Sequence, residues 1–238
     1  MHYFAIIAIG SRPALPVRRI ISLLIACLSA AYCPAQALFS LSTDLTLLHS
    51  LKEQQRFWSV GQTLRVQFQV SPTDGPDIWY GYTSAGKFRN DLVATAKDPN
   101  TQPARLPFQA RCGVSFRHLS IGWKHYLKGQ AGAGSGWNGY FCAGFGLVGG
   151  KADNRYSTAI DTAIYSLPAG PASGTGMFKR LTLDLALGAE APLGGGLYLY
   201  GEARGWLPTS DYPSRYLLVN EHAPLVGSLS LGVRILFD

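Results

Sequence analysis

Residues 228–238 read Ser-Leu-Ser-Leu-Gly-Val-Arg-Ile-Leu-Phe-Asp, and this closing stretch decides the fold class. Successive side chains of a β-strand point to opposite faces, so every second residue shares a face. The same alternation recurs at 181–191. A two-faced pattern repeated in strand after strand is typical of a transmembrane β-barrel. In the closing stretch the apolar face carries Leu229, Leu231, Val233, Ile235 and Phe237, and the other face carries Ser228, Ser230, Gly232 and Arg234.

The N-terminal segment has the composition of an export signal. Arg18 and Arg19 precede an apolar run at 20–32, and Pro-Ala-Gln-Ala follows at 34–37. Positive charge, a short apolar core and a small-x-small end are the features of a secretory signal peptide. We therefore expect a signal peptide at 1–37 and an outer-membrane barrel at 38–238. The alternatives are a buried or membrane-anchoring helix, for which the apolar core is short, and a lipoprotein signal ending at Cys27.

Composition and cysteine spacing argue against several classes of function. The formal net charge is +7, the basic residues are scattered, and no nucleic-acid-binding motif accompanies them. We therefore expect no nucleic-acid partner, and a weak attraction to anionic lipid headgroups fits better. Cys112 and Cys142 lie in strand patterns, so we expect free, lipid-facing or core-facing thiols rather than a disulfide. The cysteines lack a metal-binding spacing, and we expect no metal and no cofactor.

Period-two runs separated by Gly, Pro, Asp and Asn clusters predict eight strands. Connections are short after the second, fourth and sixth runs and long at 84–105, 149–177 and 207–224. This asymmetry is typical of a barrel with short periplasmic turns and long extracellular loops. The fourth run shifts its apolar phase, and a β-bulge near Arg117 and His118 would restore the two faces. The predicted strands are 38–48, 58–70, 77–83, 106–127, 137–148, 178–191, 197–206 and 228–237.

Aromatic side chains cluster near the ends of the predicted strands. In membrane barrels such residues form girdles at the two water–lipid interfaces. The alternative is ordinary packing in a soluble β-sandwich, which the export signal and the loop asymmetry disfavour. The girdle candidates are Trp58, Trp79, Tyr80, Tyr82, Trp123, Tyr126, Trp137, Tyr140, Tyr198, Tyr200 and Trp206.

The polar face of the strands predicts a charged barrel interior. Eight strands enclose a space that side chains can just fill, so a wide diffusion pore is not expected. Charges of both signs are present, and a buried charge needs a partner, so we expect ion pairs across the interior. The interior then acts as a structural plug or leaves a narrow path for water or small ions. The predicted interior charge network is Asp44, Arg65, Arg111, Lys124, Asp184, Glu190, Glu202, Arg204 and Arg234.

One pair of residues suggests an enzymatic alternative. His118 and Ser120 are two residues apart and share a strand face. A His–Ser pair supports ester hydrolysis if an acid orients the imidazole. Outer-membrane lipid A deacylases carry a His-x-Ser of this sort followed by asparagine, whereas Ile121 follows here and the sequence places no glutamate beside the pair. The alternative function is therefore a barrel lipid hydrolase using His118 and Ser120, and the leading expectation is a protein without catalytic residues.

Several stretches resemble a group of uncharacterised outer-membrane β-barrel, porin-family proteins of Bacteroidetes-type bacteria. The resemblance rests on 53–63, 82–92, 116–126 and 209–224, and it extends over nearly all of 38–237. It implies an eight-stranded barrel of the OmpA/OmpX-like class and carries over no catalytic residue. One departure is Asp238, which follows the aromatic Phe237 that would ordinarily end such a chain.

Taken together, these patterns predict an integral protein of the outer membrane of a Gram-negative bacterium. Its expected role is structural or surface-interacting, with at most a narrow path for small solutes or ions through a largely plugged interior. The expected partners are outer-membrane lipid and lipopolysaccharide, the barrel-assembly machinery, and an extracellular ligand at the loops.

Overall fold

The computed structural model describes residues 39–51, 55–168, 172–209 and 225–237. The signal peptide expected at 1–37 lies outside these residues. Within the described ranges, no helix is long and apolar enough to cross a membrane.

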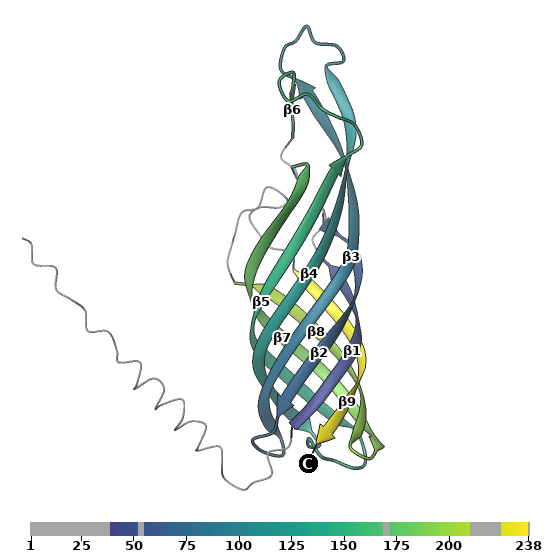
Figure 1. Ribbon diagram of the computed structural model, residues 1–238, viewed down its shortest axis with the longest axis vertical. Helices are drawn as coiled ribbons and strands as arrows, with labels where there is room; N and C mark the ends of the chain where they lie inside the picture. The colour runs from purple at the N-terminus through teal and green to yellow at the C-terminus, as the bar shows by residue number, and fades with distance from the viewer. Residues whose placement is uncertain (1–38, 52–54, 169–171, 210–224, 238) are drawn as a thin grey trace, which may run out of the picture. The chain divides into compact units, whose positions relative to one another are not determined.

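Eight antiparallel strands form a closed barrel, which confirms the fold class predicted from the sequence (Figure 1). Around the wall the order is β2-β1-β9-β8-β7-β5-β4-β3, and the pairing of β2 with β3 closes the ring. The short strand β6 pairs with the far end of β3, beyond the wall. The bounds are β1 Phe39–Ser50, β2 Trp58–Phe68, β3 Asp74–Ala96, β4 Arg105–Lys128, β5 Asn138–Tyr156, β6 Tyr165–Ser166, β7 Gly174–Gly194, β8 Leu197–Pro208 and β9 Val226–Phe237.

The first and last wall strands meet along a continuous seam. β1 and β9 pair without a register shift from Phe39 opposite Phe237 to Ser50 opposite Val226. The rings of Phe39 and Phe237 stack with centroids 4.8 Å apart at the end of this seam. The closing strand that the sequence predicts from its alternation therefore completes the barrel.

Three strands continue well beyond the ends predicted for them. Residues 84–96, expected in a loop, extend β3, and residues 149–156 extend β5 in the same way. β7 begins at Gly174 rather than Phe178, and the connection between β3 and β4 shrinks to 97–104. Figure 1 shows β3 and β4 rising past the ends of their neighbours toward β6. We call the part of the sheet formed by 84–96 of β3, 105–117 of β4 and 149–156 of β5 the sheet extension.

The β-bulge expected near Arg117 and His118 is wrong. Even-numbered residues of β4 are buried from Phe108 through His118 to Tyr126, apart from the half-buried Gly122, so this strand keeps one phase throughout. The register shift lies instead on β3, between Thr83 and Gly86. What changes along β4 is the chemistry of its inner face, which is apolar from Phe108 to Phe116 and polar from His118 to Tyr126. In the sheet extension the apolar side chains of β4 thus point inward.

The aromatic side chains divide between the two faces of the wall. Trp58, Tyr80, Tyr82, Trp123 and Trp137 are exposed on the outside, where girdle residues belong. The other girdle candidates are buried, so the girdle assignment is wrong for them: Trp79, Tyr126, Tyr140, Tyr198, Tyr200 and Trp206. Cys112 and Cys142 are also buried, and both are free.

Candidate functional site

We call the end of the barrel that carries β6 the upper end, as it is drawn in Figure 1. The lower part of the interior is built around Glu190 of β7. The Nη2 of Arg234 donates to Oε1 of Glu190 at 2.6 Å, and its Nε donates to Oε2 at 3.0 Å. Tyr126 donates its hydroxyl to the same carboxylate at 2.8 Å, and the Nζ of Lys124 lies 3.4 Å away. Side chains from β4, β7 and β9 thus converge on one carboxylate. Aromatic rings cover the two cations, with Lys124 3.7 Å from the ring of Tyr140.

A second cluster lies further up and centres on Glu202 of β8. Arg65 donates from Nη2 to Oε1 of Glu202 at 2.6 Å, and Arg204 donates from Nε to the same oxygen at 3.0 Å. Asp77 approaches both cations, with Oδ1 3.5 Å from Nε of Arg65 and Oδ2 3.9 Å from Nη2 of Arg204. All four residues are buried. The two arginines and the two carboxylates of this cluster, which come from β2, β3 and β8, therefore neutralise one another inside the barrel.

Sequence reasoning missed two charged residues of the interior. Asp77 is the first residue of the strand predicted at 77–83 and has the same phase as the inward residues of β3. Arg180 is also buried and has the phase of Thr182 and Asp184 on β7. Simple alternation carried through to the true strand ends would have found both. Asp44, which was predicted inside, is buried and accepts a hydrogen bond of 2.6 Å from Tyr200.

The His118–Ser120 pair lies above the Glu202 cluster, and its geometry does not form a triad. The Nε2 of His118 lies 3.2 Å from Oδ2 of Asp184 and 3.0 Å from Oγ1 of Thr182. Among the described residues, the polar contacts of the imidazole are with Asp184 and Thr182, and none is with Ser120. A catalytic triad needs the imidazole between the acid and the serine, with one ring nitrogen facing each. His118 is also 0% exposed.

An aromatic layer covers these polar groups at the upper end of the barrel. The ring of Trp206 packs edge-on against His118 with centroids 4.4 Å apart, and against Phe116 at 6.2 Å. Phe116 in turn packs against Phe57 and Phe178. The cavity beside Phe178 and Trp206 measures about 20 Å³, which is roughly the space that one water molecule occupies. The barrel therefore narrows to a packed layer at this level.

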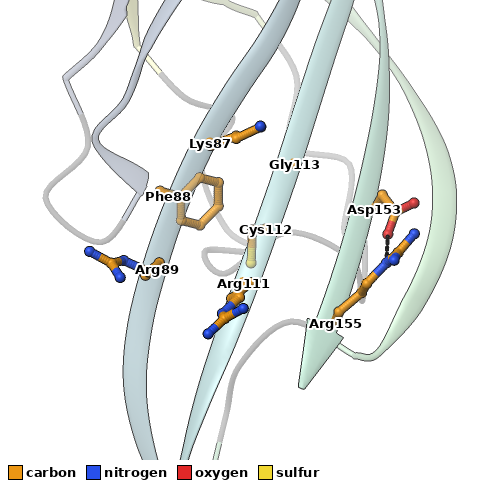
Figure 2. A pocket seen from close by; sticks show the side chains of 8 residues that line it. All are labelled: Lys87, Phe88, Arg89, Arg111, Cys112, Gly113, Asp153 and Arg155. Carbon is orange, nitrogen blue, oxygen red and sulfur yellow. Dashed lines mark hydrogen bonds and ion pairs between the residues drawn. The ribbon is translucent and has the colours of Figure 1, made fainter. Parts of the chain in front are cut away.

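Arg111, predicted inside, lies on the outer face of β4, so this part of the interior network is wrong. Cys112 takes the inward position because β4 keeps its phase through the sheet extension. Arg111 stands directly opposite Arg89 of β3 on one side and Arg155 of β5 on the other. Figure 2 shows these three arginines on three adjacent strands. We call Arg89, Arg111 and Arg155 the arginine row.

A hollow of about 620 Å³ opens beside the arginine row. Gly113 leaves it without a side chain at its centre, because Gly113 lies opposite Lys87 on one side and Asp153 on the other. The Nε of Arg155 lies 3.3 Å from Oδ1 of Asp153, and Arg111 donates from Nε to Gln109 at 3.2 Å. Four cations and a single carboxylate line this hollow. Like charges directly opposite one another destabilise a sheet, so the arrangement favours an anion.

The outer face of the wall below the sheet extension is apolar. Across β4, β5 and β7 the outward rows are Ile121–Phe145–Leu183 and Leu119–Leu147–Leu181. A continuous exposed surface of this kind belongs against lipid. The next row upward is Arg117–Gly149–Lys179, so the apolar surface ends abruptly at two exposed cations. We call Arg117, Gly149 and Lys179 the boundary row.

No protein-family model and no curated protein matches this sequence. Its fold is similar to that of solved outer-membrane barrels. Neisserial surface protein A is 11% identical, with 83% of this chain and 96% of that chain covered and a TM-score of 0.53. The outer membrane protein OprG of Pseudomonas aeruginosa is 9% identical, with 85% and 96% covered and a TM-score of 0.49. Ail, the attachment invasion locus protein of Yersinia pestis, is 9% identical, with 84% and 99% covered and a TM-score of 0.48.

Proposed function

We propose that this outer-membrane-type barrel is an integral outer-membrane protein with a surface-interaction role and no open pore. The observation that carries the proposal is the pair of charge clusters around Glu190 and Glu202, which join strands across the interior. The apolar belt of the outer wall supports insertion in the bilayer. The sheet extension supports a role at the cell surface, because it raises charged side chains above that belt.

The two clusters oppose the passage of solutes through the barrel. A solute moving along the axis must displace Arg65 from Glu202 or Arg234 from Glu190. Separating a buried ion pair leaves an uncompensated charge and costs about 3–5 kcal/mol. The aromatic layer with Phe116 and Trp206 adds a second barrier above them. At most a thin file of water or small ions is compatible with this interior.

Single-channel recording on the barrel refolded into planar bilayers tests the proposal. The wild-type protein should give no stable open-channel steps. The double variant Arg65→Ala, Glu202→Ala removes both partners of one cross-barrel pair and should raise the leak of small ions. Stable porin-like steps from the wild-type protein would contradict the proposal. Asp153→Asn, which alters an ion pair on the outer face, is the matched control and should behave as the wild type.

A further inference from the structure

The outer face of β4, β5 and their neighbours carries cations at two heights. The boundary row lies one row above Leu119, Leu147 and Leu181, so it stands where hydrocarbon gives way to headgroups. Arg117 and Lys179 flank Gly149, which places no side chain between them, and strands in a sheet are spaced 4.7–4.9 Å apart, so the backbones of the two cationic residues stand about 10 Å apart. Lys151, exposed on β5, lies two residues further up.

The arginine row lies higher on the same lateral face. Six residues of β4 separate Arg117 from Arg111, which corresponds to about 20 Å along the strand. A barrel strand tilts by about 35–45°, so the arginine row stands about 15 Å above the boundary row. This is too high for a lipid headgroup phosphate and matches the sugars carried by a surface glycolipid. The hollow beside Gly113 opens on this outer, lateral face of the sheet.

The arginine row lacks internal compensation for its charge. Asp153 pairs with Arg155, but the part of the chain that the structure describes gives Arg89 and Lys87 no ion pair. Three guanidinium groups across adjacent strands span about 10 Å, and guanidinium groups bind phosphate oxygens in bidentate fashion. The row therefore suits a ligand with two closely spaced phosphates better than a single small anion.

We propose that this face is a two-level docking site for one molecule of phosphorylated outer-leaflet glycolipid, a lipopolysaccharide. Its acyl chains lie against Leu119, Leu147 and Leu181, its headgroup phosphates contact Arg117 and Lys179, and phosphates on its inner sugars contact the arginine row. The inference rests on the proposed membrane-embedded surface role. It names the partner of that role, and it does not depend on whether the interior conducts.

The test measures the affinity of three probes for the full-length protein, which is purified from membranes in detergent and immobilised on a surface. The probes are lipopolysaccharide with a phosphorylated core, lipopolysaccharide with an unphosphorylated core, and lipid A alone. Arg111→Gln should weaken binding of the first probe by about tenfold, as loss of one charge-assisted contact predicts. It should change binding of the other two probes by less than about twofold. Lys179→Gln should weaken binding of all three probes, because each carries the headgroup phosphates.

Arg105→Gln is the matched control, because Arg105 is exposed on the same strand, six residues from Arg111 and outside the row. It should leave all three affinities unchanged. Equal loss for Arg105→Gln and Arg111→Gln would show only general charge attraction and overturn the site. Unchanged binding of the phosphorylated core by Arg111→Gln would overturn the upper level. Inositol hexakisphosphate binding as tightly as the first probe would show that the row takes free polyphosphates, and would overturn the glycolipid assignment.

The thermal unfolding of the same variants separates binding from stability. Without ligand, Arg111→Gln should leave the unfolding midpoint unchanged or raise it, because it removes like-charge repulsion from the row. A large drop in the midpoint would show that the arginine row is structural. These outcomes are independent of the conductance result, so failure of the docking site and failure of the closed-barrel proposal remain distinguishable.

Discussion

Arg65 on β2 and Glu202 on β8 are joined across the barrel interior, with Nη2 2.6 Å from Oε1, although their strands are three positions apart around the wall. Both side chains are 2% exposed. The contact links segments 137 residues apart in the sequence. It ties two strands that are not neighbours in the wall directly to each other through the interior.

Glu202→Gln should lower the free energy of unfolding by about 3–5 kcal/mol, because Arg65 and Arg204 would lose their shared counter-charge in a buried site. Urea unfolding in lipid vesicles, followed by tryptophan fluorescence, measures the change. The exposed pair of Asp153 and Arg155 offers a control, and Asp153→Asn should cost less than about 1 kcal/mol. Equal effects of the two substitutions would contradict the assigned difference between buried and surface pairs.

Gly146→Ala should destabilise the barrel by about 1–3 kcal/mol, the usual cost of overpacking an interior. A Cβ at Gly146 would collide with His118 Nε2 and crowd Asp184 and Thr182. The control is Gly205→Ala on the outer face, where a Cβ would meet nothing within 4 Å. The two variants are compared by heating samples before electrophoresis and measuring the temperature at which the compact folded band disappears from the gel. The prediction is wrong if Gly146→Ala unfolds at the same temperature as the wild-type protein.

Phe145→Arg should cost about 2–4 kcal/mol, because Phe145 is exposed in the middle of the apolar outer rows. Met177→Arg should be tolerated within about 1 kcal/mol, since Met177 lies above the boundary row where the outer surface is already polar. Refolding yield and urea unfolding in phospholipid vesicles check this pair. A similar cost for both would place the hydrocarbon boundary higher than the boundary row.

Asp74 gives a pH dependence at the turn-side end of β3. Hydrogen bonds from Thr73, His125 and Trp123 lower the pKa of its carboxyl from 3.8 to about 2. Because the folded pKa is the lower one, these bonds stabilise the protein above about pH 4, and the contribution is lost as the pH falls toward 2. The unfolding midpoints of wild type and Asp74→Asn should differ at pH 6 and converge between pH 4 and 2. A constant difference down to pH 2 would contradict the assignment.

Alternation predicts the strands that pass through lipid and fails above it. The runs at 197–206 and 228–237 were predicted to within two residues of β8 and β9, because one face meets hydrocarbon and the other a polar interior. In the sheet extension the outer face meets water, so Lys87, Arg89 and Arg111 point outward and Phe88 points inward. A rule that assigns apolar residues to the outer face therefore gives the wrong face in the sheet extension.

That inversion accounts for the main errors at the candidate site. It explains why Arg111 is predicted in the interior and why a bulge is predicted near Arg117 and His118, whereas 84–96 is predicted as a loop because the stretch is polar. The pairing of Arg89, Arg111 and Arg155 could not be predicted, because it depends on the register across three strands. The interior positions of Arg65, Glu202 and Arg234 were accessible from phase alone, whereas their choice of partner needed the closed ring.

The seam between β1 and β9 has a consequence for assembly. The first and the last wall segments to leave the ribosome are neighbours in the finished ring, so the barrel cannot close until the whole chain has been delivered. Until then β1 and β8 both expose unpaired backbone groups, which is untenable in a bilayer. A chain shortened by even its final twelve-residue strand loses two ladders at once, and the order of synthesis makes completion of the ring an all-or-none event.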